Sequence, residues 1–423
     1  MQRHESYKPS GVKWIGDVPA HWDVRPGFTC FDENKDRNKR LTEKTVLSLS
    51  YGRIIVKSEE KMTGLVPESF DTYQLIKPGD IVIRTTDLQN DKTSLRVGLA
   101  KDKGMITSAN LGLRCKPEIN PEYIFRLLES YDSLKVFYGM GSGLRQNIDF
   151  WDFKRLPVPL PPRTEQDRIV KFLDQKATEI DAAIDKKKRL VELLQEQKKI
   201  LINRAVTNGL SMEVPRHQSG ISWAGMVPAH WPNRYLKHIF KEIDLRSNTG
   251  KEALYSLRMS GQLVRHKDVS DKPITADQLI GYKLVQPGQL VMNRMRASIG
   301  LFAIANEHGL VSPDYAVFDP IVDVVQEYFL ALFRNSAIQG VFLTESKGLG
   351  TGSSGFLRLY SDRFGAIKVP CPPLAEQKEI VAAIHSIQEQ FKKVERPVEV
   401  EIENLQEMRT TLIATTVTGQ IRV

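Results

Sequence analysis

The stretch WIGDVPAHW, residues 14–22, returns almost unchanged as WAGMVPAHW at residues 223–231. The longer segments around these two stretches, 10–25 and 219–234, are identical at 10 of 16 positions and are offset by 209 residues. At 423 residues, the chain is long enough for two or three domains with their own cores. The repeat therefore indicates that one structural unit is used twice.

The repeat continues beyond this opening motif. Three further pairs match at offsets of 209 to 211 residues: YQLIKPGDIVIR (73–84) with YKLVQPGQLVMN (282–293), LPVPLPPRTEQ (156–166) with IKVPCPPLAEQ (367–377), and ILINRAVTNGL (200–210) with TLIATTVTGQI (411–421). A period of about 210 residues is far longer than the ~20–50 residues of solenoid repeats. We therefore expect a duplicated domain and a duplicated connector: domains at 1–160 and 211–370, and helices at 161–210 and 371–423.

Each of the two domains mixes short strands with amphipathic helices. Residues 45–50 and 253–258 predict short strands, as do the runs that follow the two Pro-Gly turns. Residues 121–130 and 326–336 have the apolar spacing of helices. Because no regular βαβ rhythm is present, the pattern favours compact α/β domains with a mixed sheet.

The connectors predict long helices. Thr164 can cap the first, Glu165 lies in its first turn, and neither Pro nor Gly occurs from there to about Asn208. Nine of its 11 heptad a and d positions are apolar over five heptads, and all five d positions of the second helix are apolar: Ile384, Phe391, Val398, Leu405 and Leu412. This pattern predicts an antiparallel coiled coil within the chain, with a pseudo-two-fold repeat, and Pro397 predicts a kink or split in the second helix. The alternative is that each helix packs separately on its own domain.

Composition narrows the class of protein. The chain is 41% hydrophobic and 26% charged, with a net charge of +9 that divides into +4, +3, +4 and −2 over the four segments. This balance fits a nucleic-acid partner. No apolar run approaches the ~20 residues that span a bilayer, and Cys30, Cys115 and Cys371 are too far apart for a metal or disulfide pattern. We expect a cytoplasmic protein with reduced thiols and no membrane association.

Catalytic motifs are absent from the sequence. It contains no GxxxxGK[ST] phosphate loop, no HExxH or GxSxG, no zinc pattern and no [DN]PP[YF] methyltransferase tetrad. The repeated His21 and His230 lie beside Trp22 and Trp231, and we expect the imidazoles to cap turns while the indoles anchor the loops in a core. These absences predict a chain that is not an enzyme.

Two loops in each unit combine glycine, small polar residues and arginine. They lie at 82–96 and 139–150 in the first unit and at 291–300 and 346–360 in the second. Such loops can approach phosphates closely, and Arg, Asn and Gln can read base edges. The predicted DNA-binding residues are Arg84, Thr85, Thr86, Lys92, Arg96, Ser142, Arg145, Gln146, Asn147, Asn293, Arg294, Arg296, Lys347, Ser353, Ser354 and Arg358. For any single residue, the alternative is a solvated surface loop.

Together these features resemble the specificity (S) subunit of Type I restriction-modification systems. The resemblance rests on the two W-x-G-x-V-P-x-H-W motifs, on PPxxEQ at 161–166 and 372–377, on the domain–helix–domain–helix order, and on residues 292–317. It implies that each domain is a target recognition domain for one half of a bipartite double-stranded DNA sequence. It also implies that the two helices hold the half-sites apart and dock two methyltransferase (modification) subunits, with two restriction (motor-nuclease) subunits joining the full assembly.

The resemblance also bears on cofactors. It implies that S-adenosylmethionine, ATP and Mg²⁺ act on the partner subunits and that this chain binds no cofactor or metal. One departure is that the first unit has IRTTDLQ at 83–89 where the family commonly has an RMR pattern. The alternative function is a solitary DNA-binding scaffold or regulator without a methyltransferase partner.

Overall fold

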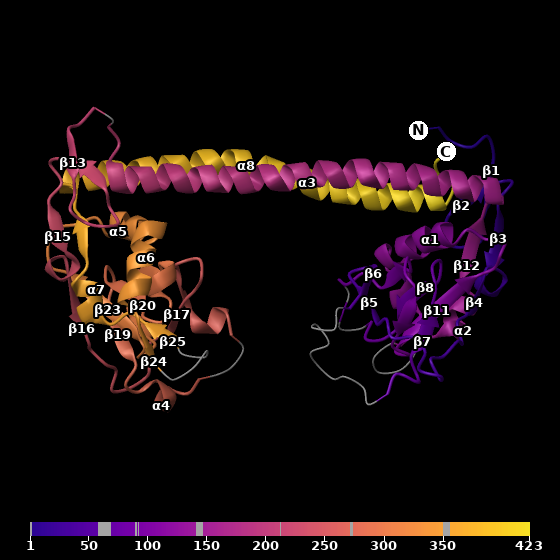
Figure 1. Cartoon of the computed structure of the whole chain (residues 1–423), viewed down its shortest axis with the longest axis horizontal. Helices are drawn as coiled ribbons and strands as arrows, with labels where there is room; N and C mark the ends of the chain where they lie inside the picture. Colours follow the sequence, from indigo (N-terminus) through magenta and orange to yellow (C-terminus); the bar gives the residue numbers. More distant parts are fainter. Residues whose placement is uncertain are drawn as a thin grey trace. The chain divides into compact units, whose positions relative to one another are not determined.

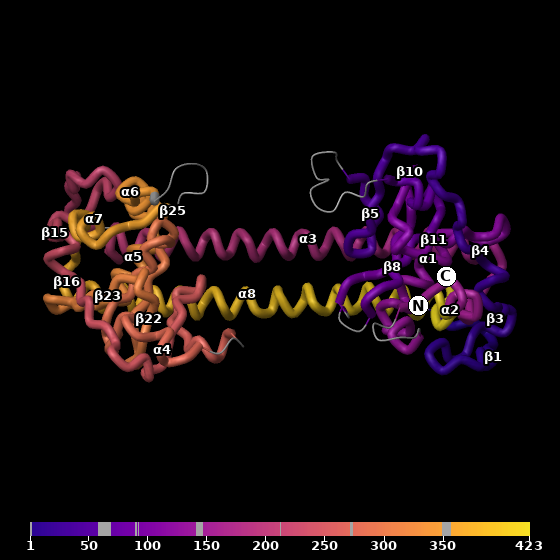
Figure 2. Tube along the Cα trace, turned by 90° about the horizontal axis from the view of Figure 1, so that it is seen from below, coloured from indigo at the N-terminus to yellow at the C-terminus, as the bar shows by residue number. Residues whose placement is uncertain are grey.

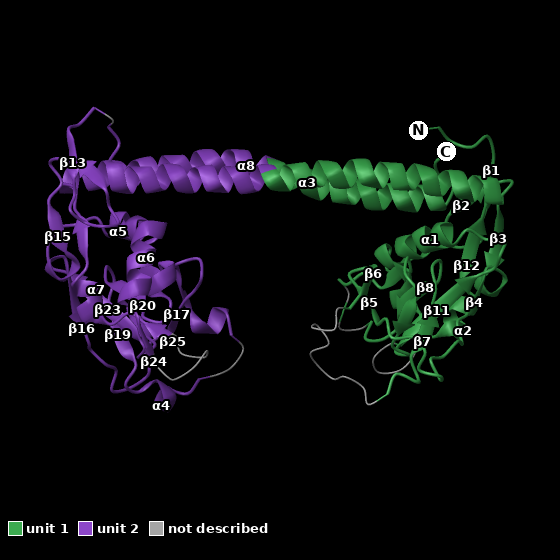
Figure 3. Ribbon diagram, in the orientation of Figure 1, with its two compact units in different colours: residues 1–189, 398–423 green, residues 190–397 purple. Residues whose placement is uncertain are grey.

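The computed structural model describes residues 2–57, 69–88, 91, 93–140, 147–211, 213–270, 274–349 and 356–423. The chain forms two compact units (Figure 3): unit 1 comprises residues 1–189 and 398–423, and unit 2 comprises residues 190–397. Each unit thus contains one α/β domain and part of both long helices. The division that we expected from the sequence has four segments and separates the two domains from the two helices. That division stays a prediction.

Unit 1 is built around the antiparallel four-stranded sheet β4-β11-β8-β9, with several two-stranded ribbons beside it (Figure 1). Its strands are β1 Tyr7–Pro9, β2 Asp17–Pro19, β3 Asp23–Pro26, β4 Phe31–Glu33, β5 Leu47–Ser50, β6 Arg53–Val56, β7 Gln74–Ile76, β8 Ile81–Arg84, β9 Val97–Leu99, β10 Gly104–Ile106, β11 Asn110–Cys115 and β12 Pro157–Leu160. Its short helices are α1 Pro121–Ser133 and α2 Phe150–Lys154. The chain ends lie close together (Figure 2), because Gln2 forms a β-bridge with Arg422.

Unit 2 repeats this plan around the antiparallel sheet β16-β23-β20-β21. Its strands are β13 Arg216–Gln218, β14 Met226–Pro228, β15 Asn233–Tyr235, β16 Phe240–Ile243, β17 Tyr255–Leu257, β18 Leu263–Arg265, β19 Lys283–Val285, β20 Leu290–Asn293, β21 Phe302–Ile304, β22 Gly309–Val311, β23 Tyr315–Pro320, β24 Lys347–Leu349, β25 Phe356–Arg358 and β26 Lys368–Pro370. Its short helices are α4 Ala276–Leu279, α5 Gln326–Phe333, α6 Ser336–Glu345 and α7 Ser361–Gly365. The expected combination of helices and strands is therefore confirmed in both halves of the chain. The expectation of a mixed sheet was wrong, because the strands of both four-stranded sheets pair antiparallel.

The two long helices are α3, Arg163–Asn208, and α8, Leu374–Val417. The predicted heptads are confirmed, because every a and d position of α3 and every d position of α8 is buried or half-buried. Two details of the prediction were wrong. Since α3 already begins at Arg163, Thr164 is a helical residue and not the cap. In addition, α8 is not split at Pro397, which lies inside one continuous helix, and the alternative of a kink stays a prediction.

Within each unit the helices pair with each other in antiparallel fashion. In unit 1, Asp181 and Lys187 of α3 form ion pairs with Arg409 and Glu401 of α8, so the numbers rise along one helix as they fall along the other. In unit 2, Lys198 of α3 donates to Glu395 at 2.8 Å. The separate packing of each helix on its own domain is therefore excluded.

The helix pair and the α/β domain share one core in each unit. In unit 1 the apolar core includes Ile180 and Ile184 of α3, Leu412 and Ile413 of α8, and the fully buried Trp22. In unit 2 the corresponding cluster includes Val206, Ile380 and Trp231. Burying such side chains contributes roughly 1.5–3 kcal/mol each, so the shared core holds the helix pair to its domain.

Buried tyrosines fasten each domain to the far ends of the helices. The Tyr123 hydroxyl in α1 donates to the carbonyl oxygens of Pro159 at 2.7 Å and of Val417, at the end of α8, at 3.1 Å. The equivalent Tyr328 in α5 donates to the carbonyl of Val206 in α3 at 2.9 Å. Helix C-termini leave carbonyls without intrahelical partners, and these hydroxyls supply donors for them.

The PPxxEQ motifs place a clip at the start of each long helix. Gln166 donates to the Pro161 carbonyl and accepts from the backbone N–H of Asn120, both at 2.9 Å. In unit 2, Gln377 makes the same two bonds, to Pro372 and from Val325, also at 2.9 Å. Both glutamines are 2% exposed. The nitrogen and the oxygen of each buried side-chain amide therefore need hydrogen-bond partners, and both atoms have one. The clip joins the start of each long helix to the loop that precedes α1 or α5.

The opening motifs behave partly as expected. Trp22 and Trp231 are buried anchors, as predicted. The two imidazoles do not cap their turns: the Nε2 atom of His21 lies 2.9 Å from Glu165, and that of His230 lies 2.7 Å from Glu376. The motif histidines therefore contact the glutamates of the PPxxEQ motifs, more than 140 residues away in the sequence, which sequence reasoning did not foresee.

Two further expectations from the sequence concern the state of the cysteines and the absence of membrane-spanning segments. Cys30, Cys115 and Cys371 are free thiols. Burial raises the pKa of Cys115 to about 12. Among the described residues, no helix combines the length and the apolar character that a bilayer crossing requires.

Candidate nucleic-acid interface

The two predicted loops of unit 1 meet beside the end of β8. The backbone N–H of Ile148 donates to the Thr85 carbonyl at 3.1 Å. The Asn147 side chain accepts from the backbone N–H of Asp87 at 3.3 Å. Asn147 is exposed, while Thr85 and Thr86 are half-buried. Four predicted residues of these loops lie outside the described residues: Lys92, Ser142, Arg145 and Gln146.

Arg96 organises this loop from inside. Its side chain is fully buried, with 0% exposed, and its guanidinium donates to the carbonyls of Thr86 at 2.8 Å, Asp87 at 3.0 Å and Asp91 at 2.5 Å. It also donates to the Tyr138 hydroxyl at 3.3 Å. A guanidinium that is enclosed and bonded to its own backbone is not available to bases or phosphates. The prediction of Arg96 as a DNA contact is thus wrong, and its role is to shape the loop.

Arg84 remains at the surface of the same loop. Its side chain is 40% exposed and pairs with Asp91 at 3.0 Å. The backbone N–H of Ser94, followed by the Ser94 side chain, the Thr93 N–H and Arg84, holds the pKa of Asp91 well below its usual range against a smaller opposing effect of burial. Asp91 is therefore ionised at neutral pH and turns the loop back toward Arg96.

The two predicted loops of unit 2 meet in the same way. The backbone N–H of Leu359 donates to the Arg294 carbonyl at 2.9 Å. Arg294 and Leu359 occupy the repeat positions of Thr85 and Ile148, which form the corresponding bond in unit 1. One tertiary hydrogen bond thus brings the loops together in both units, although the loop sequences differ.

Several predicted residues of unit 2 are held by the protein itself. Arg294 donates to Glu242 at 2.6 Å and to the Ser361 hydroxyl at 3.2 Å, and Arg358 pairs with Asp314 at 3.1 Å. Asn293 is 7% exposed and accepts from the backbone N–H of Met295 at 3.1 Å. We therefore expect Asn293 to support the loop, whereas the two arginines keep part of their surface.

Two predicted residues of unit 2 are exposed. Arg296 lies in the loop after β20, and Lys347 stands opposite Arg358 in the β24–β25 hairpin. Ser353 and Ser354 fall outside the described residues. The exposed cations of unit 2 that the structure describes in these loops are therefore Arg296 and Lys347, with Arg294 and Arg358 partly covered.

Sequence reasoning missed the turn between β17 and β18. Met259 in this turn is 61% exposed, and its sulfur lies 2.8 Å from the Arg296 guanidinium. The neighbouring Arg258 is also exposed. The signal was available, since RMSGQ at 258–262 is a polar, glycine-containing turn between two short strands.

An exposed aromatic side chain in unit 1 was also missed. Trp151 of α2 is 58% exposed, directly after the candidate loop at 139–150. Lys154 and Arg155 each lie 5.0 Å from its ring centre. Exposed aromatic rings among cations are typical of surfaces that contact nucleic acids or proteins. The sequence signal was the basic, aromatic run FWDFKR at 150–155.

Unit 1 also contains a cleft of about 860 Å³ between the β5–β6 hairpin, α1 and the helix pair. Two of its cations are paired with acids: Arg126 with Glu129 and Asp174, and Arg409 with Asp181. We assign no ligand to this cleft.

Comparison with known proteins decides the family. The family described as "Type I restriction modification DNA specificity domain" matches residues 35–200 and 276–402, one stretch in each repeat. The chain belongs to the Type I restriction-modification DNA specificity family. The resemblance drawn from the motifs is thereby confirmed, and the chain is a Type I specificity subunit.

Relatives of this specificity subunit match it over most of its length. A protein of Methanocaldococcus jannaschii, provisionally named the type I restriction enzyme MjaX specificity subunit, is 23% identical and covers 97% of this chain and 96% of its own. The EcoKI specificity subunit of Escherichia coli is 22% identical, over 84% of this chain and 77% of its own. Both relatives are named as specificity subunits.

A solved structure supports the fold. A chain from work on complex assembly and conformational transition of the type I R-M system superposes with a TM-score of 0.64. It is 16% identical and covers 96% of this specificity subunit and 99% of that chain. At this level of identity, the likeness shows the fold alone.

Proposed function

We propose that this specificity subunit reads a bipartite double-stranded DNA target, one half through the loops of each unit. The observation that carries the proposal is a hydrogen bond that joins the two loops at equivalent positions in both units, although the loop sequences differ. The bond runs from Ile148 to Thr85 in unit 1 and from Leu359 to Arg294 in unit 2. A common scaffold with divergent tips is what two different half-sites require. Phosphate contacts then position the protein, while contacts to base edges specify the sequence.

In unit 2 the reading surface comprises the exposed Arg296, the turn around Arg258 and Met259, and the β24–β25 hairpin with Lys347. Arg294 and Arg358 are held by acidic residues and supply oriented guanidiniums at its edge. In unit 1 the reading surface comprises Arg84, Thr85, Thr86 and Asn147. Guanidiniums suit guanine edges, and amides suit adenine edges.

We further propose that the helix pairs dock two methyltransferase subunits, with two restriction subunits joining through them. Support comes from apolar side chains on the helix surfaces that the partner helix leaves uncovered. On α3 these are Leu190, Leu193 and Ile200, which are 42%, 46% and 58% exposed. On α8, Met408 is 50% exposed and lies beside an apolar groove that includes Leu412 and Ile421. Exposed apolar surface of this kind marks protein interfaces.

In this scheme the chain is not an enzyme. S-adenosylmethionine, ATP and Mg²⁺ act on the partner subunits, and the chain contributes sequence recognition. No phosphate loop or methyltransferase motif is present in the sequence. Tight binding of S-adenosylmethionine by the purified chain alone would contradict this assignment.

The test separates the two half-sites. The methylated motif is read by sequencing the DNA of cells that carry the wild-type chain, Arg296→Ala or Asn147→Ala, each with the methyltransferase partner. We expect Arg296→Ala to relax the motif in one half and Asn147→Ala to relax it in the other. A lost guanine contact should cost ~1–3 kcal/mol on the correct site, and a lost phosphate contact should weaken all sequences alike.

Lys13→Ala is the matched control, because it removes an exposed cation that lies in neither loop and on neither long helix. It should leave the motif unchanged. Relaxation of both halves by a single loop variant would refute the assignment of one half to each unit. Sequence-specific binding without any methylated motif would instead indicate the solitary DNA-binding scaffold.

A further inference from the structure

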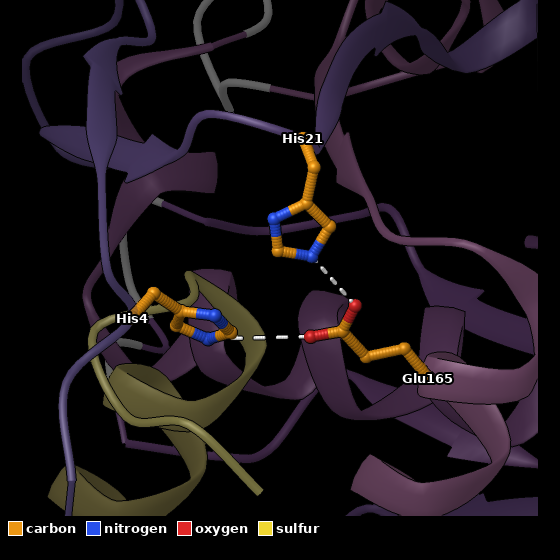
Figure 4. A group of neighbouring side chains, drawn as sticks. All are labelled: His4, His21 and Glu165. Atoms are coloured by element: carbon orange, nitrogen blue, oxygen red, sulfur yellow. Dashed lines mark hydrogen bonds and ion pairs between the residues drawn. The ribbon is translucent and has the colours of Figure 1, made fainter.

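Three side chains from distant parts of unit 1 converge at the start of α3 (Figure 4). His4 comes from the N-terminal segment, His21 from the first repeated motif, and Glu165 from the first turn of the helix. The Nε2 atom of His21 lies 2.9 Å from one carboxylate oxygen of Glu165, and that of His4 lies 4.0 Å from the other. The three ligand atoms all lie within 4.8 Å of one another.

The cluster contains a buried polar atom without a partner. The His4 side chain is 7% exposed and that of Glu165 is 8% exposed. The Nε2 atom of His4 is buried and has no hydrogen-bond partner, although it faces the carboxylate. An unsatisfied buried nitrogen costs about 1–3 kcal/mol, so its presence calls for an explanation.

Unit 2 shows what the same site looks like without the first histidine. There Glu376 accepts from both His230 at 2.7 Å and the Trp231 indole at 2.9 Å. The position that corresponds to His4 is Glu213, which is exposed. In unit 1 the equivalent Trp22 indole nitrogen is buried and unpartnered. The carboxylate of Glu165 is thus directed at the two histidines and not at the tryptophan.

We propose that His4, His21 and Glu165 form a binding site for one divalent transition-metal ion, for which Zn²⁺ is the best match. Two imidazoles and one carboxylate are ligands that Zn²⁺ takes in proteins, with a water completing a tetrahedral site. Imidazole nitrogens select transition metals over Mg²⁺ and Ca²⁺, which prefer oxygen.

The geometry needs only small adjustments. Bonds of about 2.0–2.1 Å place tetrahedral ligand atoms roughly 3.4 Å apart. His21 would move slightly away from Glu165 and His4 slightly toward it. The His21 side chain is 52% exposed, so it can rotate and leave room for the water ligand.

The role of such an ion would be structural. The segment around His4 contacts the residues that follow α8, because Gln2 bridges to Arg422 and the Tyr7 hydroxyl donates to the Gln420 carbonyl at 3.5 Å. An ion on His4 would therefore fasten the N-terminal segment and the chain's C-terminal end to the start of α3. The equivalent place in unit 2 lacks the third ligand, so one ion is expected for each chain.

The test is metal binding to the purified full-length chain after treatment with a chelator. Zn²⁺ is titrated in competition with a chromophoric chelator, and we expect one tight site per chain. His4→Ala and Glu165→Gln should each weaken it at least ~100-fold. His230→Ala is the matched control, since it removes the equivalent histidine of unit 2, and it should leave the site intact. Circular dichroism verifies that each variant is folded.

Two further measurements report the site independently of affinity. Co²⁺ bound in place of Zn²⁺ should give the strong visible absorption of a tetrahedral site, and this absorption should vanish in His4→Ala. Zn²⁺ should also slow amide exchange at residues 2–8 in the wild type but not in that variant. Absence of stoichiometric binding, or binding that His4→Ala leaves unchanged, would overturn the proposal. Equal loss in His230→Ala would overturn it as well, because the ion would then lie elsewhere.

Discussion

The buried Arg96 offers the sharpest test of how the reading loop of unit 1 is built. In Arg96→Met, a side chain of similar length fills the space but cannot donate hydrogen bonds. The Thr86 carbonyl would lose its donor, whereas the carbonyls of Asp87 and Asp91 would each lose one of two donors, because they also accept from the Asp91 N–H and the Tyr138 hydroxyl. The variant therefore isolates the hydrogen bonds of the guanidinium from its packing.

The magnitude follows from the contacts. Each buried carbonyl left without a donor costs about 1–3 kcal/mol, offset in part because the buried guanidinium no longer needs to be desolvated. Hydrogen bonds that involve a charged group contribute about 1.5–3 kcal/mol each. Because Arg96→Met loses several such bonds, we expect a loss of about 3–5 kcal/mol in the free energy of opening of the loop.

The assay is native-state hydrogen exchange of peptides that cover residues 81–99. A loss of about 3–5 kcal/mol corresponds to exchange faster by roughly 10²- to 10⁴-fold. Arg84→Met is the matched control from the same loop. Its side chain is 40% exposed and makes a surface ion pair, so the change should stay below about 1 kcal/mol.

Two outcomes would refute the reasoning. If Arg96→Met exchanges within about fivefold of the wild type, the guanidinium does not hold the loop. If that variant keeps its protection but loses affinity for DNA as a phosphate or base contact would, Arg96 is a binding residue after all.

Three other predictions concern stability and reactivity. Gly419→Ala should destabilise unit 1 by more than Gly209→Ala destabilises unit 2 in thermal unfolding, because both glycines have positive φ but only the Cβ at 419 would lie 2.3 Å from Pro19. The pKa of Asp91 is depressed in the folded state, so the stabilising effect of its carboxylate is present above its ordinary pKa of 3.8 and is lost as the pH falls below that value. Amide hydrogen exchange in residues 85–96, corrected for its intrinsic pH dependence, should reveal this loss of stability in the wild type and not in Asp91→Asn. The Cys115 thiol has a pKa of about 12 against an ordinary 9.0, so it should react with iodoacetamide at pH 8 about a thousand-fold more slowly than in the unfolded chain. Mass spectrometry of the alkylated protein measures this rate. Equal rates in the folded and unfolded chains would contradict the burial of this thiol.

The sequence by itself determined the architecture at the level of repeats. Two copies of one motif and a shared offset require two similar domains and two similar helices, since similar sequences fold alike. The heptads of α3 and α8 could be predicted because helical periodicity is a local property of the sequence. A stripe of apolar residues therefore indicates a buried helix face before the packing partner is known. The sequence could not show that α8 continues through Pro397, since packing on both sides of the proline offsets one lost backbone hydrogen bond.

Only the tertiary structure decided what individual side chains do. Arg96 and Arg84 look alike in the sequence, yet one is enclosed by carbonyls and the other faces solvent. His4, His21 and Glu165 have no recognisable metal-ligand spacing, because their proximity arises from how the N-terminal segment, a loop and a helix end pack together. Burial and hydrogen bonding depend on neighbours that are distant in sequence. A local pattern can therefore predict which elements form, but it cannot predict which of their polar groups stay free to bind.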